Sequence, residues 1–137
     1  MDKILLGAVV FQLILTFYLM FLMGFSRIAA IKNHQVKMKD IALGDDKYPS
    51  KVKQIANAFN NQFQMPIIFY FGVVLSLFFG QVGLFEIILA YAFVVSRYIH
   101  AFIHITNNNL VWRLNAYFVG CLILMVFLVL VFFKGLF

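Results

Sequence analysis

Four long apolar segments, separated by polar connections, constrain the fold of this chain more than any other feature. They lie at about 4–24, 66–80, 84–105 and 110–133. A helix that crosses the hydrocarbon core of a bilayer needs roughly 20 apolar residues. Only 12% of the residues are charged, which is about half the share in an average soluble domain. The sequence therefore predicts an all-α integral membrane protein.

The second apolar segment is too short to cross a membrane by itself, so its helix must begin earlier. Pro49 and Ser50 are typical of a helix start. No small-residue cleavage site follows the first segment, so we expect that segment to stay as a membrane span. The prediction is a single four-helix transmembrane domain over residues 1–137, with helices at about 4–24, 51–79, 84–105 and 110–133.

Positive charge is concentrated in one connection. Seven Lys and Arg residues lie between Arg27 and Lys53, whereas the connection around Gln81 has none. Lys and Arg mark the cytoplasmic side of membrane proteins. We therefore expect the 25–54 loop and the turn at 106–109 in the cytoplasm and both termini outside. Topology and contact with anionic lipid explain the net charge of +6, and nothing in it suggests nucleic-acid binding.

The third predicted helix carries Arg97, His100 and His104 on one face, at spacing i, i+3 and i+7. Arg97 lies roughly 12 Å from the helix end at 1.5 Å per residue, and a guanidinium that faces lipid at that depth is costly. We expect it to face the bundle interior, with snorkelling to the cytoplasmic interface as the alternative. Two histidines suit a metal ion, but no acidic residue lies nearby and Arg97 would repel a cation, so we predict no metal site.

The second predicted helix carries Asn57, Asn61 and Gln64 on one face, at spacing i, i+4 and i+7. Pro66 has no N–H, so the carbonyl of Gln62 loses its usual helical partner. Buried amides of this kind either join helices through hydrogen bonds or contact a ligand. The sequence leaves both interpretations open.

The fourth predicted helix begins with Arg113 and Tyr117, one turn apart. Snorkelling is the alternative interpretation of Arg113. The polar positions of the second, third and fourth helices lie at the same depth, which predicts a cationic pocket for an anionic ligand. No catalytic triad, P-loop or dinucleotide-binding pattern occurs, and the single Cys121 excludes an intrachain disulfide.

These segments resemble the MAPEG superfamily, the membrane-associated proteins in eicosanoid and glutathione metabolism, and in particular its short bacterial members. The resemblance covers nearly the whole chain and rests on NNQFQMP at 60–66, SRYIHAFIH at 96–104 and NNNLVWRLNAY at 107–117. It implies a homotrimer in a bacterial inner membrane, with glutathione as a co-substrate between subunits. The implied activity is a transferase or peroxidase acting on lipophilic electrophiles or hydroperoxides. The alternative is a non-catalytic member that binds lipid or a protein partner.

The resemblance also implies roles for individual residues. Arg113 would stabilise the glutathione thiolate as the catalytic residue. Gln64 stands where the family has a glutamate, Asn57 where eicosanoid-metabolising relatives have an arginine, and His104 where they have a tyrosine. The residues expected to bind glutathione are Arg27, Asn57, Asn61, Gln64, Arg97, His100, His104 and Tyr117.

Overall fold

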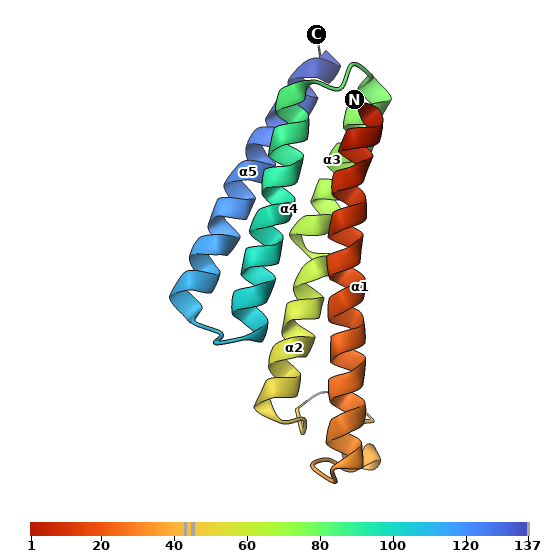
Figure 1. Cartoon of the computed structure of the whole chain (residues 1–137), viewed down its shortest axis with the longest axis vertical. Helices are drawn as coiled ribbons and strands as arrows, with labels where there is room; N and C mark the ends of the chain where they lie inside the picture. The colour runs from red at the N-terminus through yellow and green to blue at the C-terminus, as the bar shows by residue number, and fades with distance from the viewer. Residues whose placement is uncertain (43, 45, 137) are drawn as a thin grey trace.

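The protein is a bundle of long helices that lie side by side (Figure 1). The computed structural model describes residues 1–42, 44 and 46–136. The α-helices are α1 (Asp2–Lys32), α2 (Ser50–Asn60), α3 (Met65–Phe79), α4 (Leu84–Ile105) and α5 (Leu110–Leu136), and two short 3-10 helices are η1 (Met38–Asp40) and η2 (Asn61–Phe63). No strand occurs among these residues, so the prediction of an all-α fold is confirmed.

Both termini lie at one end of the bundle, and the connection between α1 and α2 lies at the other (Figure 1). α1 continues to Lys32 and α5 to Leu136, beyond the predicted ends at 24 and 133, because a helix does not stop where its apolar residues stop. The 31 residues of α1 span about 46 Å, against about 30 Å for a bilayer core. The ends of α1 and α2 accordingly extend past the turn between α4 and α5 (Figure 1).

The second membrane span is not the continuous helix that the sequence predicts over 51–79. α2 ends at Asn60, η2 follows, and Gln64 has φ −105° and ψ −103° before α3 begins. Pro66 explains the break, because it has no N–H to continue the helical hydrogen bonds. α2 and α3 nevertheless stack end to end beside α1 (Figure 1), and together they form one candidate span of 30 residues.

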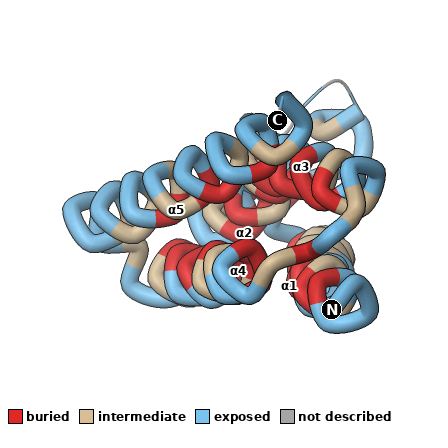
Figure 2. Tube along the Cα trace, turned by 90° about the horizontal axis from the view of Figure 1, so that it is seen from above, coloured by how far each residue is buried: buried red, intermediate tan, exposed pale blue. Residues whose placement is uncertain are grey.

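Aromatic side chains join α3, α4 and α5 in the interior. The ring of Phe69 stacks on Phe93 with centroids 4.9 Å apart and lies 6.1 Å from Phe127. All three side chains are fully buried. Buried positions line the inside of the bundle, while the outer faces are exposed (Figure 2). Those faces carry large apolar side chains such as Phe78 and Phe85, which suits contact with lipid.

An ion pair fixes the end of the bundle that holds the termini. Lys134 Nζ on α5 lies 2.8 Å from Glu86 Oε1 on α4. Ser76 Oγ and the Gly83 N–H both donate to Glu86 Oε2, at 3.1 and 2.9 Å. The carboxylate therefore joins α3, α4 and α5 at this end. Lys134 neutralises its charge, and Ser76 and Gly83 donate hydrogen bonds to it.

Candidate functional site

A polar recess of about 500 Å³ lies where α2, η2, α4 and α5 meet. This volume is in the usual range for small-molecule sites. All of the predicted site residues except Arg27 and Arg97 line it. The full lining is Asn57, Asn60, Asn61, Gln64, His100, His104, Arg113, Leu114 and Tyr117.

The guanidinium of Arg113 is held at this recess by two neighbours. Its Nη1 donates to Asn108 Oδ1 at 2.6 Å and lies 3.3 Å from His104 Nε2. In the described part of the chain these contacts involve Nη1 alone, while a guanidinium has five N–H donors. The remaining donors can therefore serve an anion in the recess.

The three asparagines between α4 and α5 each have a different structural role. Asn107 Oδ1 accepts the N–H of Asn109 at 3.1 Å, which tightens the turn. Asn108 adopts a left-handed backbone with φ 52°, which asparagine tolerates better than most residues. Asn109 Oδ1 accepts the N–H of Trp112 at 3.1 Å and so caps α5. Together they fix the start of α5, and with it Arg113, relative to α4.

Two side chains of α2 close over the end of α4. Gln54 Nε2 donates to the carbonyl of His104, and Lys51 Nζ donates to that of Ile105, both at 2.5 Å. The last carbonyls of a helix have no partner within the helix, so these bonds satisfy them. They also hold α2, and hence Asn57, against the histidine face of α4. Sequence reasoning missed both contacts.

Three rings form one wall of the recess. The ring of His100 lies 5.8 Å, centroid to centroid, from both His104 and Tyr117. The two histidines thus come together as their spacing predicts. The described residues contain no group of three or more His, Cys, Asp or Glu that could hold a metal ion, and His104 Nε2 already faces a guanidinium.

Arg97 lies behind the recess and does not line it. Arg97 is only 1% exposed, so its side chain faces the bundle interior and does not snorkel. Nη2 donates to the carbonyl of Asn61 at 3.4 Å, and Cζ lies 5.7 Å from the centroid of the Tyr117 ring. Both of these residues line the recess, so the positive charge of Arg97 stands directly behind its wall.

Arg27 is not brought to the recess within one chain. Its Cζ lies 5.4 Å from the centroid of the Tyr48 ring, beside the connection between α1 and α2. Only the family resemblance predicts Arg27 as a site residue. The spacing of residues along α1 does not indicate where the Arg27 side chain lies.

A buried amide pair joins α1 to the break in the second span. Gln12 Nε2 donates to Gln62 Oε1 at 2.8 Å, and Gln62 Nε2 donates to the Ala58 carbonyl at 3.3 Å. Gln62 therefore acts as interhelical glue, whereas Asn57 and Gln64 are exposed and line the recess. Sequence reasoning did not single out Gln12. Its position as a lone amide within the first apolar segment is the signal that could have identified it.

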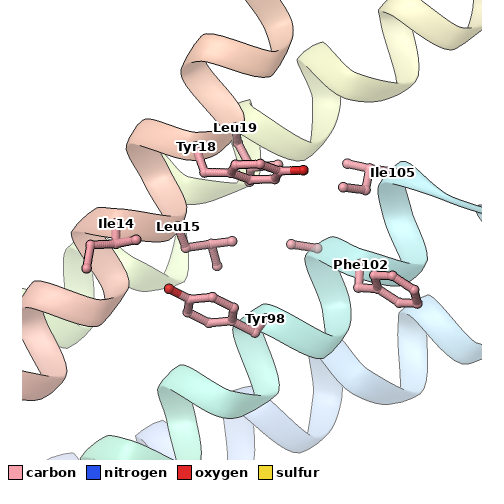
Figure 3. A pocket seen from close by; sticks show the side chains of 8 residues that line it. Ile14, Leu15, Tyr18, Leu19, Tyr98, Phe102 and Ile105 are labelled. Carbon is pink, nitrogen blue, oxygen red and sulfur yellow. The ribbon is translucent and has the colours of Figure 1, made fainter.

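A second cavity, the apolar groove, lies between α1 and α4 and measures about 330 Å³ (Figure 3). The hydroxyl of Tyr98 donates to the carbonyl of Phe11 at 2.8 Å beside it. The groove thus offers an apolar surface on another face of the bundle. Its lining is Ile14, Leu15, Tyr18 and Leu19 from α1, and Tyr98, Ala101, Phe102 and Ile105 from α4.

Comparison with known proteins gives one result that bears on identity. Residues 5–133 match the MAPEG family. No curated protein and no solved structure gives a significant match. The family match spans almost all of the 137 residues. In the described part of the chain four helical segments, α1, α2 together with α3, α4 and α5, are long and apolar enough to cross a membrane. The protein is therefore an integral, multi-pass membrane protein. The chain belongs to the MAPEG family, within the superfamily of membrane proteins of glutathione and eicosanoid metabolism.

Proposed function

We propose that the polar recess binds glutathione, and that the protein transfers it to lipophilic electrophiles or uses it to reduce hydroperoxides. One observation carries the proposal. The guanidinium of Arg113, fixed by His104 and Asn108, faces a polar recess in a chain of a glutathione-associated family.

The proposed chemistry depends on the thiolate form of glutathione. A cysteine thiol has a pKa of about 8.5, so only a few per cent is ionised at neutral pH. A guanidinium beside the sulfur favours the charged form and lowers the pKa of the thiol. Each pKa unit corresponds to about 1.4 kcal/mol. In a conjugation the thiolate sulfur forms a bond to the electrophilic carbon as the leaving group departs, and Arg113 would hold that sulfur.

The rest of the recess suits the peptide and the carboxylates of glutathione. The side-chain amides of Asn57, Asn61 and Gln64 provide donors and acceptors along one side of the recess. Arg97 would attract a carboxylate through its charge behind the wall. Arg27 would contribute only if a neighbouring subunit brought it to the recess.

We also propose that the protein is a homotrimer whose recess opens to the cytoplasm. The exposure of Asn57, Asn60 and Gln64 in a single chain supports it. Polar side chains near the hydrocarbon of a membrane are usually covered by protein or water. A neighbouring subunit would cover these amides and complete the recess.

The test uses the purified full-length protein in mild detergent. Glutathione at tens of millimolar should raise the melting temperature, because stabilisation follows RT ln(1 + [L]/Kd). Arg113→Leu should remove most conjugation of a halonitrobenzene. Lys53→Leu, which removes an exposed positive charge outside the recess, should not. A wild-type protein that shows neither stabilisation nor conjugation would contradict the proposal.

A second candidate function is the non-catalytic binding of a lipid, and the apolar groove favours it. Its 330 Å³ and apolar side chains suit an acyl chain (Figure 3). Under this alternative the purified protein carries a stoichiometric lipid, detected by mass spectrometry, and does not respond to glutathione.

A further inference from the structure

Among the residues that the structure describes, the polar recess has positive charge and no negative charge. Arg113 lines it, and Arg97 lies behind its wall in contact with Asn61 and Tyr117. None of the nine lining residues is acidic. Every other polar group in the lining is an amide, an imidazole or a phenol.

The chain has few other carboxylates to offer. It contains five acidic residues, and none of them lies within 47–85 or 87–137. Glu86 is paired with Lys134 at the end of the bundle that holds the termini. Asp2 begins α1 at that same end (Figure 1). The remaining three lie in sequence between α1 and α2, at positions 40, 45 and 46.

This charge distribution also limits what a second copy of the chain can add. The helices that form the recess, α2, η2 and α5, contain no carboxylate, and the one carboxylate on α4 lies near its start. A neighbouring subunit that covers the recess with its own helices would bring further amides and apolar groups. The α2, η2 and α5 of a neighbouring subunit would bring no carboxylate to the recess.

A bound ammonium group would therefore find hydrogen-bond acceptors without a compensating charge. The amide oxygens of Asn57, Asn61 and Gln64 can accept from it, but they do not offset its repulsion by two guanidinium groups. Charge repulsion is stronger in a partly desolvated site than in water, and a buried charge needs a partner. A carboxylate or a thiolate is stabilised by the same surroundings.

We infer that the recess selects anionic thiols that lack a free ammonium group, because its described lining holds guanidinium charge and no carboxylate. The inference rests on the proposed function, since it concerns the thiol that this recess holds. The preferred ligand class comprises thiols with carboxylate groups whose amine is acylated or absent. Glutathione, which carries one ammonium group, is then a weaker ligand of the same recess.

The test compares three thiols that share a cysteinylglycine part. They are glutathione, N-acetylglutathione, and glutaryl-cysteinylglycine, in which hydrogen replaces the amine. Kd from thermal shift and kcat/KM for conjugation are measured for each thiol with the purified full-length protein. We expect both amine-free thiols to bind at least fivefold more tightly than glutathione. Since the glutaryl compound adds no bulk, its result separates loss of charge from new contacts made by the acetyl group.

Two matched variants locate the selectivity. Gln64→Glu adds a carboxylate to the lining. We expect glutathione to bind this variant at least as tightly as the two amine-free thiols do. Gln81→Glu makes the same chemical change in the exposed connection between α3 and α4 and should leave the wild-type preference unchanged. Should Gln64→Glu not fold, Asn57→Asp places a carboxylate in the same lining, and the wild-type comparison needs no variant.

The outcomes separate the two proposals. Equal or tighter binding of glutathione by the wild-type protein overturns this inference and leaves the proposed function intact. A preference for amine-free thiols that neither Gln64→Glu nor Asn57→Asp changes overturns the claim that the missing carboxylate sets the selectivity. Failure of all three thiols to bind or react overturns the proposed function, and this inference with it.

Discussion

Asn108 provides a detailed test of how Arg113 is positioned. Asn108→Gly removes the Oδ1 that accepts from Arg113 Nη1 at 2.6 Å. Glycine adopts the left-handed φ of 52° found here without steric cost. A hydrogen bond to a charged group contributes about 1.5–3 kcal/mol. The lower end of this range applies to the bond between Asn108 and Arg113, because Arg113 is half-buried and keeps its contact with His104.

A loss of about 1.4 kcal/mol corresponds to a factor of ten. We therefore expect kcat/KM for glutathione conjugation to fall about tenfold in Asn108→Gly, as measured with saturating electrophile and varied glutathione. Asn108→Ala should show the same loss of activity. Its melting temperature should also be lower than that of Asn108→Gly, because a left-handed backbone costs alanine about 1–2 kcal/mol.

Two results would refute this reasoning. Wild-type kcat/KM in Asn108→Gly would show that the contact does not position Arg113. Equal melting temperatures for the glycine and alanine variants would show that the left-handed turn carries no strain. Asn107→Ala is the control, because it weakens the same turn but leaves the acceptor for Arg113 in place.

The remaining predictions concern the bundle and its assembly. Glu86→Gln leaves Lys134 without its ionic partner and should destabilise the protein by up to about 3 kcal/mol. That is the low end for a buried pair, since the Lys134 side chain is 22% exposed; an unchanged melting temperature would contradict it. Lys47→Cys, in a Cys121→Ser background, should react with a membrane-impermeant maleimide only from the cytoplasmic side, and labelling only from outside would reverse the topology. Native mass spectrometry should detect a trimer, and monomer alone across mild detergents would count against it.

Local spacing was enough to predict most of the recess. Arg97, His100 and His104 share a face of one helix because of their spacing, and so do Arg113 and Tyr117. Membrane thickness then places polar residues of different helices at a common depth. The apolar lengths of the first, third and fourth segments likewise predict three of the spans, and the helix start at Pro49 and Ser50 predicts the second.

Contacts between distant positions could not be read in the same way. The bonds from Lys51 and Gln54 to the end of α4 depend on how α2 is placed. Pro66 indicated the loss of one helical hydrogen bond, but the prediction over 51–79 was a continuous helix, so it included neither the break before α3 nor the conformation of Gln64. Arg97 shows the limit of spacing most clearly. Its helical face was predicted, yet its position behind the wall depends on Asn61 and Tyr117 from other helices.

The position of the thiol sulfur in an experimental structure of the glutathione complex tests the central claim most directly. We predict the sulfur within about 3–4 Å of the Arg113 guanidinium, with the peptide part along Asn57, Asn61 and Gln64. A complex in which the sulfur lies in the apolar groove between α1 and α4, or anywhere out of reach of Arg113, would contradict the claim that the polar recess is the thiol site.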